Sequence, residues 1–597
     1  MKLYKLKIQN FRKLNNVELT FGDATFLIGA NNAGKSSTLD AIAILLSTQK
    51  LDASYRSRYY DEVQDKEIED NAETIIEGEF RDVSEAILEE RGFYRERLKR
   101  YTKDDGSEGF SFTYRVRFGT DGKSHREMLM HTYGFKDEYQ GCETPQDFIE
   151  KGVNAAKFGN VDLTKKIKSA QLPELYEKLN EIFKVEENEE WFENPGGIAA
   201  VVLSKLPEFL QIGTNVDTDE IESKTGALQT ILLRLFTTVR DKSENYERAH
   251  VALEALAKEM DPHDTTTDFG QMMQELNHVV ASVFPKSQIK VGANLSNADV
   301  LKPSFDVSMR SNVETAVDLQ GTGMLRSAIF ALLRYSKQRE TNNNSERGLI
   351  IGFEEPELFL HPNAANNMRS IIYELAGGES QVICTTHSPY MIDISRNEKM
   401  VLNSYSIAEH DFTSTFCFNH SEEFKNLQDD DKKRVKMVQK VDDYVSRVFF
   451  AQRVVIVEGD TEDIIFKKTI EVMPETARKY VCDRYQVIKA VGKATLISLV
   501  NYLRAMNVDL FVVHDRDQGI EGAERMNQPI LDALGGDESK RMMMHENIED
   551  EFGYGPISFD KPYRAYEHVK DWTSWEDVPD NWKTKMKIIF SDIEEQL

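Results

Sequence analysis

Two pairs of carboxylates in the C-terminal part of the chain have the residue types and positions of a divalent-metal site. Glu458 and Glu462 follow the apolar run Val-Val-Ile-Val, and Asp515 and Asp517 follow the run Leu-Phe-Val-Val. Short apolar runs of this kind predict buried strands of a parallel sheet, and an open α/β sheet binds its ligands where such strands end. Carboxylate oxygens bind hard divalent cations, and two cations about 4 Å apart suit an in-line attack on a phosphodiester. We therefore expect these four side chains to hold one or two metal ions.

A complete phosphate-binding loop lies near the N-terminus, between a predicted strand at 26–28 and a predicted helix at 37–46. In such a loop the glycines let backbone N–H groups surround the phosphates, and the helix directs its positive end at the anion. Lys35 is placed to reach the β- and γ-phosphates, and the Ser36 hydroxyl is placed to ligate Mg²⁺. The residues expected to contact ATP are Gly29, Asn31, Asn32, Ala33, Gly34, Lys35, Ser36 and Ser37.

The partners that this loop needs for hydrolysis appear far downstream. A predicted strand at 349–353 ends at Glu354 and Glu355. We expect Glu354 to bind Mg²⁺, directly or through water, and Glu355 to polarise the attacking water. His387 follows the next predicted strand and is placed to contact the γ-phosphate. Gly321 and Gly323 open a predicted helix, where glycine N–H groups form a second phosphate site. Together with the loop, these residues predict an ATPase.

Composition sets limits on the other functions. The chain has 597 residues, which predicts two to four domains. Its formal charge of −27 counts against a broadly basic DNA-coating surface but does not exclude DNA cleavage, because bound metals and local basic clusters can offset the field. Two local basic clusters remain, Arg95–Arg100 and Lys432–Lys440, although each taken alone is more readily explained as a solvated helix face. We expect no membrane span and no signal peptide, because no apolar run is long enough and the chain starts as a strand. Four scattered cysteines suit a reducing cytoplasm.

The spacing of the motifs indicates how the chain is divided. The phosphate-binding loop and Gly321 are too far apart for one compact ATPase, so we expect an insertion between them. Within it, apolar side chains from Met272 to Val283 recur at helical spacing. The predicted organisation is therefore an ATPase formed by residues 1–165 and 286–425, a helical insertion at 166–285 that serves as a dimerisation module, and a second α/β domain at 440–597.

Asn10-Phe11-Arg12 and the loop at 29–36 together resemble the RecF/SMC branch of the ABC ATPases. That resemblance implies a head that is active only when two copies sandwich ATP, with Gly321 and Gly323 completing the site of the partner copy. The chain departs from the common Leu-Ser-Gly-Gly-Gln signature. The sequence shows no clear Q-loop of the kind found in such heads, and Gln49 and Gln64 are candidates for its glutamine. The expected assembly is a homodimer or a higher homo-oligomer.

The C-terminal pattern resembles a Toprim domain, a Rossmann-like metal-binding fold. An ABC head followed by Toprim, with Glu354-Glu355-Pro356-Glu357 before Leu360-His361-Pro362, resembles the OLD (overcoming lysogenization defect) family of ATP-dependent nucleases. The resemblance implies that Glu458, Glu462, Asp515 and Asp517 are metal ligands. It also implies that Glu549 is a further acidic ligand, ahead of its neighbours Glu546 and Asp550, and that Lys561 stabilises the pentavalent phosphate.

The leading hypothesis is an ATP-regulated, Mg²⁺- or Mn²⁺-dependent DNA endonuclease, acting in anti-phage defence by resemblance, with a phage-encoded trigger or accessory protein as a further candidate partner. One alternative is a RecF-like, ATP-driven DNA clamp whose Toprim module is not catalytic. Another is an ATPase sensor that releases a separate toxin. The intact carboxylate set argues against the clamp, because unpaired carboxylates repel one another without a cation.

Overall fold

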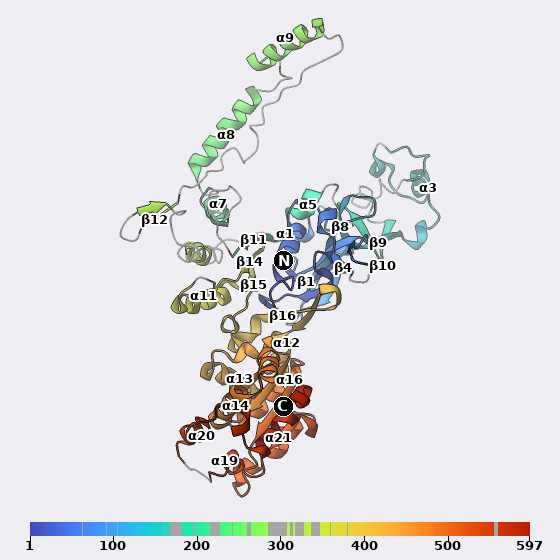
Figure 1. Cartoon of the computed structure of the whole chain (residues 1–597). Coiled ribbons are helices and arrows are strands. Elements are labelled where there is room, and N and C mark those ends of the chain that lie inside the picture. Colours follow the sequence, from blue (N-terminus) through green and yellow to red (C-terminus); the bar gives the residue numbers. More distant parts are fainter. Residues whose placement is uncertain are drawn as a thin grey trace. The chain divides into compact units, whose positions relative to one another are not determined.

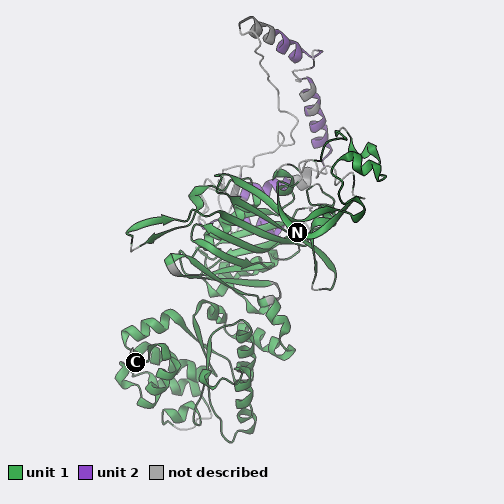
Figure 2. Cartoon of the chain, turned by 90° about the vertical axis from the view of Figure 1, so that its right-hand side faces the viewer, with its two compact units in different colours: residues 1–211, 345–597 green, residues 212–344 purple. Residues whose placement is uncertain are grey.

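The computed structural model places most of the chain in two compact units, residues 1–211 with 345–597 and residues 212–344 (Figures 1 and 2). None of the described helices is both long enough and apolar enough to cross a membrane. The residues that the structure describes are 1–167, 179, 182–214, 227–283, 307–310, 314–316, 328–335 and 347–597, with gaps at 62–63, 91, 104, 160, 196, 198, 241–242, 260–263, 265, 359, 379, 555–558 and 597.

The N-terminal part of the sequence forms a seven-stranded antiparallel sheet in the first unit. Its strand order is β10-β9-β8-β6-β1-β2, and β7 pairs with β8. Alternate side chains of its strands are buried, as in β6, which is the pattern of a sheet that packs on one face only. The strands are β1 (Lys2–Phe11), β2 (Leu14–Thr20), β6 (Thr74–Arg81), β7 (Lys99–Thr102), β8 (Glu108–Phe118), β9 (Ser124–Phe135) and β10 (Phe183–Glu193). A separate hairpin joins β4 (Arg58–Asp61) and β5 (Lys66–Glu69).

A second sheet has the order β11-β14-β15-β3-β16-β17 and positions the ATP motifs. Its central strands run parallel and are buried on both faces, so their apolar runs are continuous rather than alternating. The strands are β3 (Ala24–Gly29), β11 (Glu208–Ile212), β14 (Leu349–Glu354), β15 (Ser380–Thr385), β16 (Met400–Ile407) and β17 (Thr413–Phe418). Helix α1 (Lys35–Leu46) follows β3, and α11 (Pro362–Leu375) lies between β14 and β15 in the chain.

The C-terminal part forms a third, parallel sheet with the order β19-β18-β20-β21. The strand order changes direction between β18 and β20, and α/β sheets bind ligands at such a switch point. The strands are β18 (Arg453–Val457), β19 (Tyr485–Lys489), β20 (Leu510–His514) and β21 (Arg541–Met543). The helices are α14 (Asp460–Val472), α15 (Glu475–Arg484), α16 (Lys493–Ala505), α17 (Glu521–Glu524), α18 (Asn527–Ala533), α19 (Ile548–Glu551), α20 (Lys561–Val569) and α21 (Asp580–Ile589).

Two helices connect the second sheet to the third, α12 (His420–Asn426) and α13 (Asp429–Val441). Both contact α16 of the C-terminal fold. The Ser446 hydroxyl also donates a hydrogen bond of 2.8 Å to the Ile392 carbonyl, which precedes β16. The C-terminal fold is therefore joined to the ATPase by packed side chains as well as by the chain itself.

The region predicted as a helical insertion, 166–285, differs from that prediction in its first part. Strand β10 pairs with β9 at the edge of the first sheet, and β11 joins the second sheet. Helices α7 (Ala227–Arg240), α8 (Glu244–Glu259) and α9 (Asp268–Val283) follow only later. The charged residues of 183–193 suit an edge strand whose outer face meets solvent. The helix expected around Met272 is present as α9.

Candidate active sites

The phosphate-binding loop lies between β3 and α1, as the motif predicts. Gly29 has φ 139° and Gly34 has φ 95°, both in the region that favours glycine. A Cβ atom at Gly29 would lie 2.2 Å from the Tyr405 carbonyl oxygen of β16, so the close approach of β16 also requires glycine there. The Lys35 ammonium donates to the carbonyls of Gly29 (3.0 Å) and Ala30 (2.7 Å). Burial lowers the pKa of Lys35, and the nearby Glu355 carboxylate opposes that shift.

The two downstream acids lie where β14 ends, beside the end of β15. Glu355 has φ 42°, and its N–H donates to the Thr385 carbonyl at 3.0 Å. This backbone conformation turns its side chain toward His387, whose Nε2 is 3.5 Å from Glu355 Oε1. Burial and the Lys35 charge lower the pKa of His387. The structure therefore brings Lys35, Glu355 and His387 together, while Gly321 and Gly323 lie outside the described residues.

Gln211, at the end of β11, is a site residue that sequence reasoning missed. Its Nε2 donates to Glu354 Oε1 at 3.3 Å and to Asp40 Oδ1 at 3.4 Å. The two glutamines considered as Q-loop candidates bond elsewhere: Gln49 donates to the Tyr55 hydroxyl at 2.7 Å and Gln64 to Asp61 at 2.8 Å. Gln211 is therefore the glutamine that contacts the predicted Mg²⁺ ligand Glu354. The feature of the sequence that could have indicated Gln211 is the short strand that leads to it.

Three carboxylates meet at the ends of β18 and β20. Glu458 Oε2 accepts a bond of 3.3 Å from the Asp515 N–H, and Glu462 in the first turn of α14 accepts one of 2.9 Å from the Gly459 N–H. Burial, with the Glu462 charge, raises the pKa of Glu458 to about 7. Burial, with the Glu462 and Glu458 charges, raises the pKa of Asp515 to about 9. The side chains are thus close enough to repel one another in a desolvated place.

Asp517 is held by a lysine that the sequence did not single out as functional. Lys493, the first residue of α16, is 4% exposed, and its ammonium lies 2.7 Å from Asp517 Oδ2. The same ammonium donates to Asn527 Oδ1 at 2.9 Å and approaches the Ala523 carbonyl at 3.3 Å. These contacts fix the loop that follows β20. The only sequence signal was a Gly-Lys pair before a predicted helix.

Glu549 and Lys561 complete the cluster. Glu549 is 1% exposed, and the Lys561 ammonium is 3.0 Å from its Oε1. Two neighbours were considered as alternatives to Glu549. Glu546 is partly exposed, and the Asp550 N–H donates to Oδ1 of Asn547, the residue that caps α19. The Glu546 carbonyl instead accepts from the N–H groups of Arg516 and Asp517 at 3.0 and 3.1 Å, which ties α19 to the loop after β20.

The donor set fits a divalent cation. Within the described part of the chain, the buried oxygens Asp515 Oδ1 and Glu549 Oε2 have no hydrogen-bond donor. Buried polar atoms are nearly always paired, so such oxygens indicate a missing cation or donor. As the side chains stand, no three acidic, histidine or cysteine residues among those described converge closely enough to enclose one ion. A cation held by three of these carboxylates would therefore require rotamer changes within the cluster.

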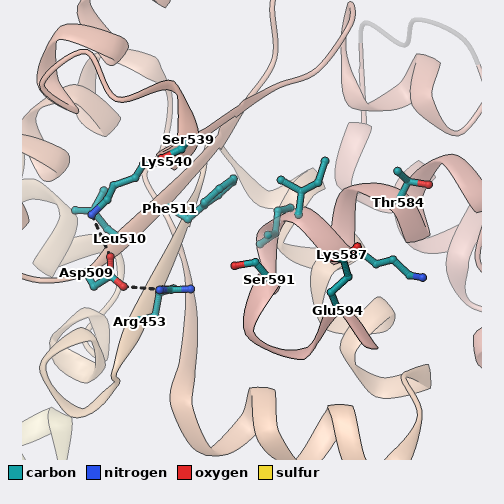
Figure 3. A pocket seen from close by; sticks show the side chains of 12 residues that line it. Arg453, Asp509, Leu510, Phe511, Ser539, Lys540, Thr584, Lys587, Ser591 and Glu594 are labelled. Atoms are coloured by element: carbon teal, nitrogen blue, oxygen red, sulfur yellow. Dashed lines mark hydrogen bonds and ion pairs between the residues drawn. The ribbon is translucent and has the colours of Figure 1, made fainter. Parts of the chain in front are cut away.

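A cavity of about 540 Å³ lies at the opposite end of the same sheet, where its strands begin (Figure 3). Arg453 and Lys540 both pair with Asp509 there, at 2.6 and 3.2 Å. The cavity contains none of the predicted site residues, and its charged groups largely satisfy one another. The carboxylate cluster, at the other ends of the strands, is the better candidate for chemistry.

Comparison with known proteins matches two family models to different parts of the chain. Residues 1–392 match the family model described as "AAA ATPase domain", and residues 449–517 match "Overcoming lysogenization defect protein-like, TOPRIM domain". The chain is 21% identical to the Old nuclease of Escherichia phage P2 over 87% of its length and 77% of that protein. It is 27% identical to the OLD nuclease of Thermus scotoductus over 37% of its length and 44% of that protein.

A third relative is the Endonuclease GajA of Bacillus cereus, 21% identical over 59% of this chain and 53% of that protein. The chain thus spans only about half of the last two relatives. Among solved structures, an Smc head bound to the C-winged helix domain of ScpA aligns over 71% of this chain and all of that chain, at 11% identity and a TM-score of 0.35. That likeness is too low to support an argument.

Proposed function

Because this chain belongs to the AAA ATPase domain family and carries the Toprim domain of overcoming lysogenization defect-like proteins, we propose that it is an ATP-regulated, divalent-metal-dependent DNA endonuclease. The observation that carries the proposal is the buried carboxylate cluster beside Lys561, with oxygens that have no donor among the described residues. The relatives named as nucleases support the same assignment. Such a cluster has no evident use in a non-catalytic DNA clamp.

The carboxylates and the two lysines of the cluster have different tasks in this proposal. Glu458, Glu462, Asp515, Asp517 and Glu549 would hold one or two Mg²⁺ or Mn²⁺ ions. When bound, such ions lower the pKa of water and offset charge on the leaving oxygen. Lys561 would neutralise charge on the scissile phosphate once Glu549 turns toward a cation. Lys493 keeps Asp517 and its loop in place, so Asp517 needs less reorganisation on binding.

The ATPase residues would act as follows. The loop from Gly29 to Ser37 binds the phosphates, Ser36 and Glu354 hold Mg²⁺, and Glu355 orients water with His387 beside it. In a homodimer or higher oligomer, Gly321 and Gly323 of a second copy would complete each site. Closing and opening of the paired heads would then control access of DNA to the carboxylate cluster.

The proposed setting is the cytoplasm of a bacterium under phage attack, with a phage-encoded trigger or accessory protein as a partner. All four cysteines are free thiols, which suits a reducing compartment. An ATPase sensor without nuclease activity would need the same ATP residues but would leave the carboxylate cluster unused.

The test is cleavage of supercoiled plasmid with Mg²⁺ or Mn²⁺, with and without ATP, by the wild-type protein and by Asp515→Ala. We expect nicking or linearisation by the wild type only, with ATP hydrolysis retained in the variant. Equal cleavage by both proteins would exclude this cluster as the nuclease site. Intact ATP hydrolysis without cleavage by the wild type would favour the clamp or the sensor.

A further inference from the structure

Helix α20, which supplies Lys561, has an exposed aromatic face. Ala565 and Val569 point into the core of the C-terminal fold. Tyr563 and Tyr566 are each 53% exposed, and Phe559, just before the helix, is 69% exposed. Residues three apart lie on the same side of a helix, separated by about 4.5 Å along its axis. Tyr563 and Tyr566 therefore form one face, which lies away from the core.

The N-terminal end of the helix that carries this face lies next to the carboxylate cluster, and the two tyrosines project from the side of the helix opposite Lys561. Lys561, two residues before Tyr563, has its ammonium 3.0 Å from Glu549 Oε1. A polymer whose reacting phosphate lies between Lys561 and the carboxylates must continue past one side of α20. Figure 1 shows α20 at the periphery of the C-terminal fold.

The charge of this segment favours bases over phosphates as the contact. Between Phe559 and Asp571 the chain has three cations, Lys561, Arg564 and Lys570, and three acids, Asp560, Glu567 and Asp571. One of these cations, Lys570, is already paired with Glu567 at 2.9 Å. The face is thus close to neutral and presents rings. Unpaired bases stack on exposed aromatic side chains regardless of sequence, whereas a duplex exposes mainly phosphates.

We propose that Phe559, Tyr563 and Tyr566 form a stacking surface for unpaired bases of the DNA strand that enters the carboxylate cluster. This inference rests on the proposed nuclease function, because it takes the strand's path from that site. It specifies the substrate: DNA that is single-stranded, frayed or unwound next to the scissile phosphate. Because stacking releases few counterions, the contribution of these rings is nearly independent of salt.

Binding is measured without cleavage, by fluorescence anisotropy in the Asp515→Ala background with a labelled single strand and a blunt duplex of the same sequence. We expect Tyr563→Ala with Tyr566→Ala to weaken single-strand binding about fivefold or more per ring, at both low and high salt. Duplex binding should change much less. The matched variants Tyr563→Phe and Tyr566→Phe keep the rings and should bind as the parent does.

A second control removes an exposed tyrosine elsewhere: Tyr60, on β4, is 57% exposed, and Tyr60→Ala should not alter binding. Unchanged urea unfolding, followed by tryptophan fluorescence, shows that the C-terminal fold of each α20 variant is intact. Equal loss on both DNA forms, or no loss, overturns the inference, as does a change of oligomeric state, which would make the face a protein interface. If single-strand binding depends on the rings but the wild type does not cleave plasmid, the nuclease proposal is refuted and the stacking surface is supported. If the wild type cleaves plasmid and the ring variants cleave equally well, the stacking surface is refuted and the nuclease proposal is supported.

Discussion

Acid should lower the unfolding free energy of the region that connects the ATPase to the Toprim domain, because one buried histidine lies there. His420, the first residue of α12, is 0% exposed and pairs through Nδ1 with the Tyr502 hydroxyl of α16. Its ring packs against Phe449 at a centroid distance of 4.8 Å. Burial lowers the pKa of His420 to about 3. The folded protein therefore holds this imidazole neutral.

The sign and size of the effect follow from linkage. In the unfolded chain a histidine titrates near 6.5, so below that pH the unfolded state binds a proton that the folded state does not. The stability that neutral His420 contributes is complete above pH 6.5 and is lost as the pH falls toward 3. Each pH unit in this range is worth up to about 1.4 kcal/mol. Between pH 7 and pH 5 the loss from this group is about 2 kcal/mol.

The assay is urea unfolding at pH 7 and pH 5, followed by tryptophan fluorescence. Trp572, Trp575 and Trp582 all lie in the C-terminal fold, so they report on this part of the chain. The control is His420→Asn, whose amide can still bond Tyr502 but does not titrate. All other ionisable groups are shared, so the wild type should lose about 2 kcal/mol more than the variant. Equal losses in the two proteins would refute the assignment to His420.

Three other variants test single contacts. Glu355→Gln should retain ATP binding but slow hydrolysis about 100-fold or more, measured by phosphate release, because it removes the proposed general base; normal turnover would refute that role. Lys493→Met should destabilise the C-terminal fold by about 3 kcal/mol in urea unfolding, since Asp517 loses a buried partner. The same variant should cleave less plasmid while its ATP hydrolysis is unchanged. Lys493→Arg should recover part of the stability and part of the cleavage. Gly29→Ala should abolish binding of a fluorescent ATP analogue, because its Cβ would lie 2.2 Å from the Tyr405 carbonyl. The control Gly522→Ala, at a glycine without a positive φ and with open space around it, should bind normally.

The sequence predicts the parts of both sites that are local in the chain. The phosphate loop, the Glu354-Glu355 pair and the Asp515–Asp517 loop each follow an apolar run that becomes a buried parallel strand. Because such strands are buried on both faces, their apolar runs are continuous and can be recognised in the sequence, and each motif lies where one of these strands ends. The prediction of an ATPase followed by an OLD-like Toprim domain is confirmed by the family models.

The residues that sequence reasoning missed make contacts across long separations. Gln211 bonds to Glu354, 143 positions away, from a five-residue strand with no motif of its own. Lys493 pairs with Asp517 only because α16 begins beside the loop that follows β20. Strand β10 was also missed, because an edge strand needs little apolar surface and its run of glutamates resembles a helix. Each case depends on a neighbour that only the folded sheet supplies.

The strong negative charge of the chain limits how it can hold DNA. The two basic clusters are largely engaged within the protein: Arg95 and Arg100 pair with Glu85 and Glu108, and Arg97 is 3% exposed. In the second cluster, Lys432 and Lys433 pair with Asp429 and Asp430. In the function proposed here, affinity would come from contacts that do not need a basic surface, namely base stacking on α20 and phosphate oxygens bridged to the carboxylates by cations. Both contacts concentrate binding at the scissile phosphate, so a shallow dependence of affinity on salt is the expected mark of this protein.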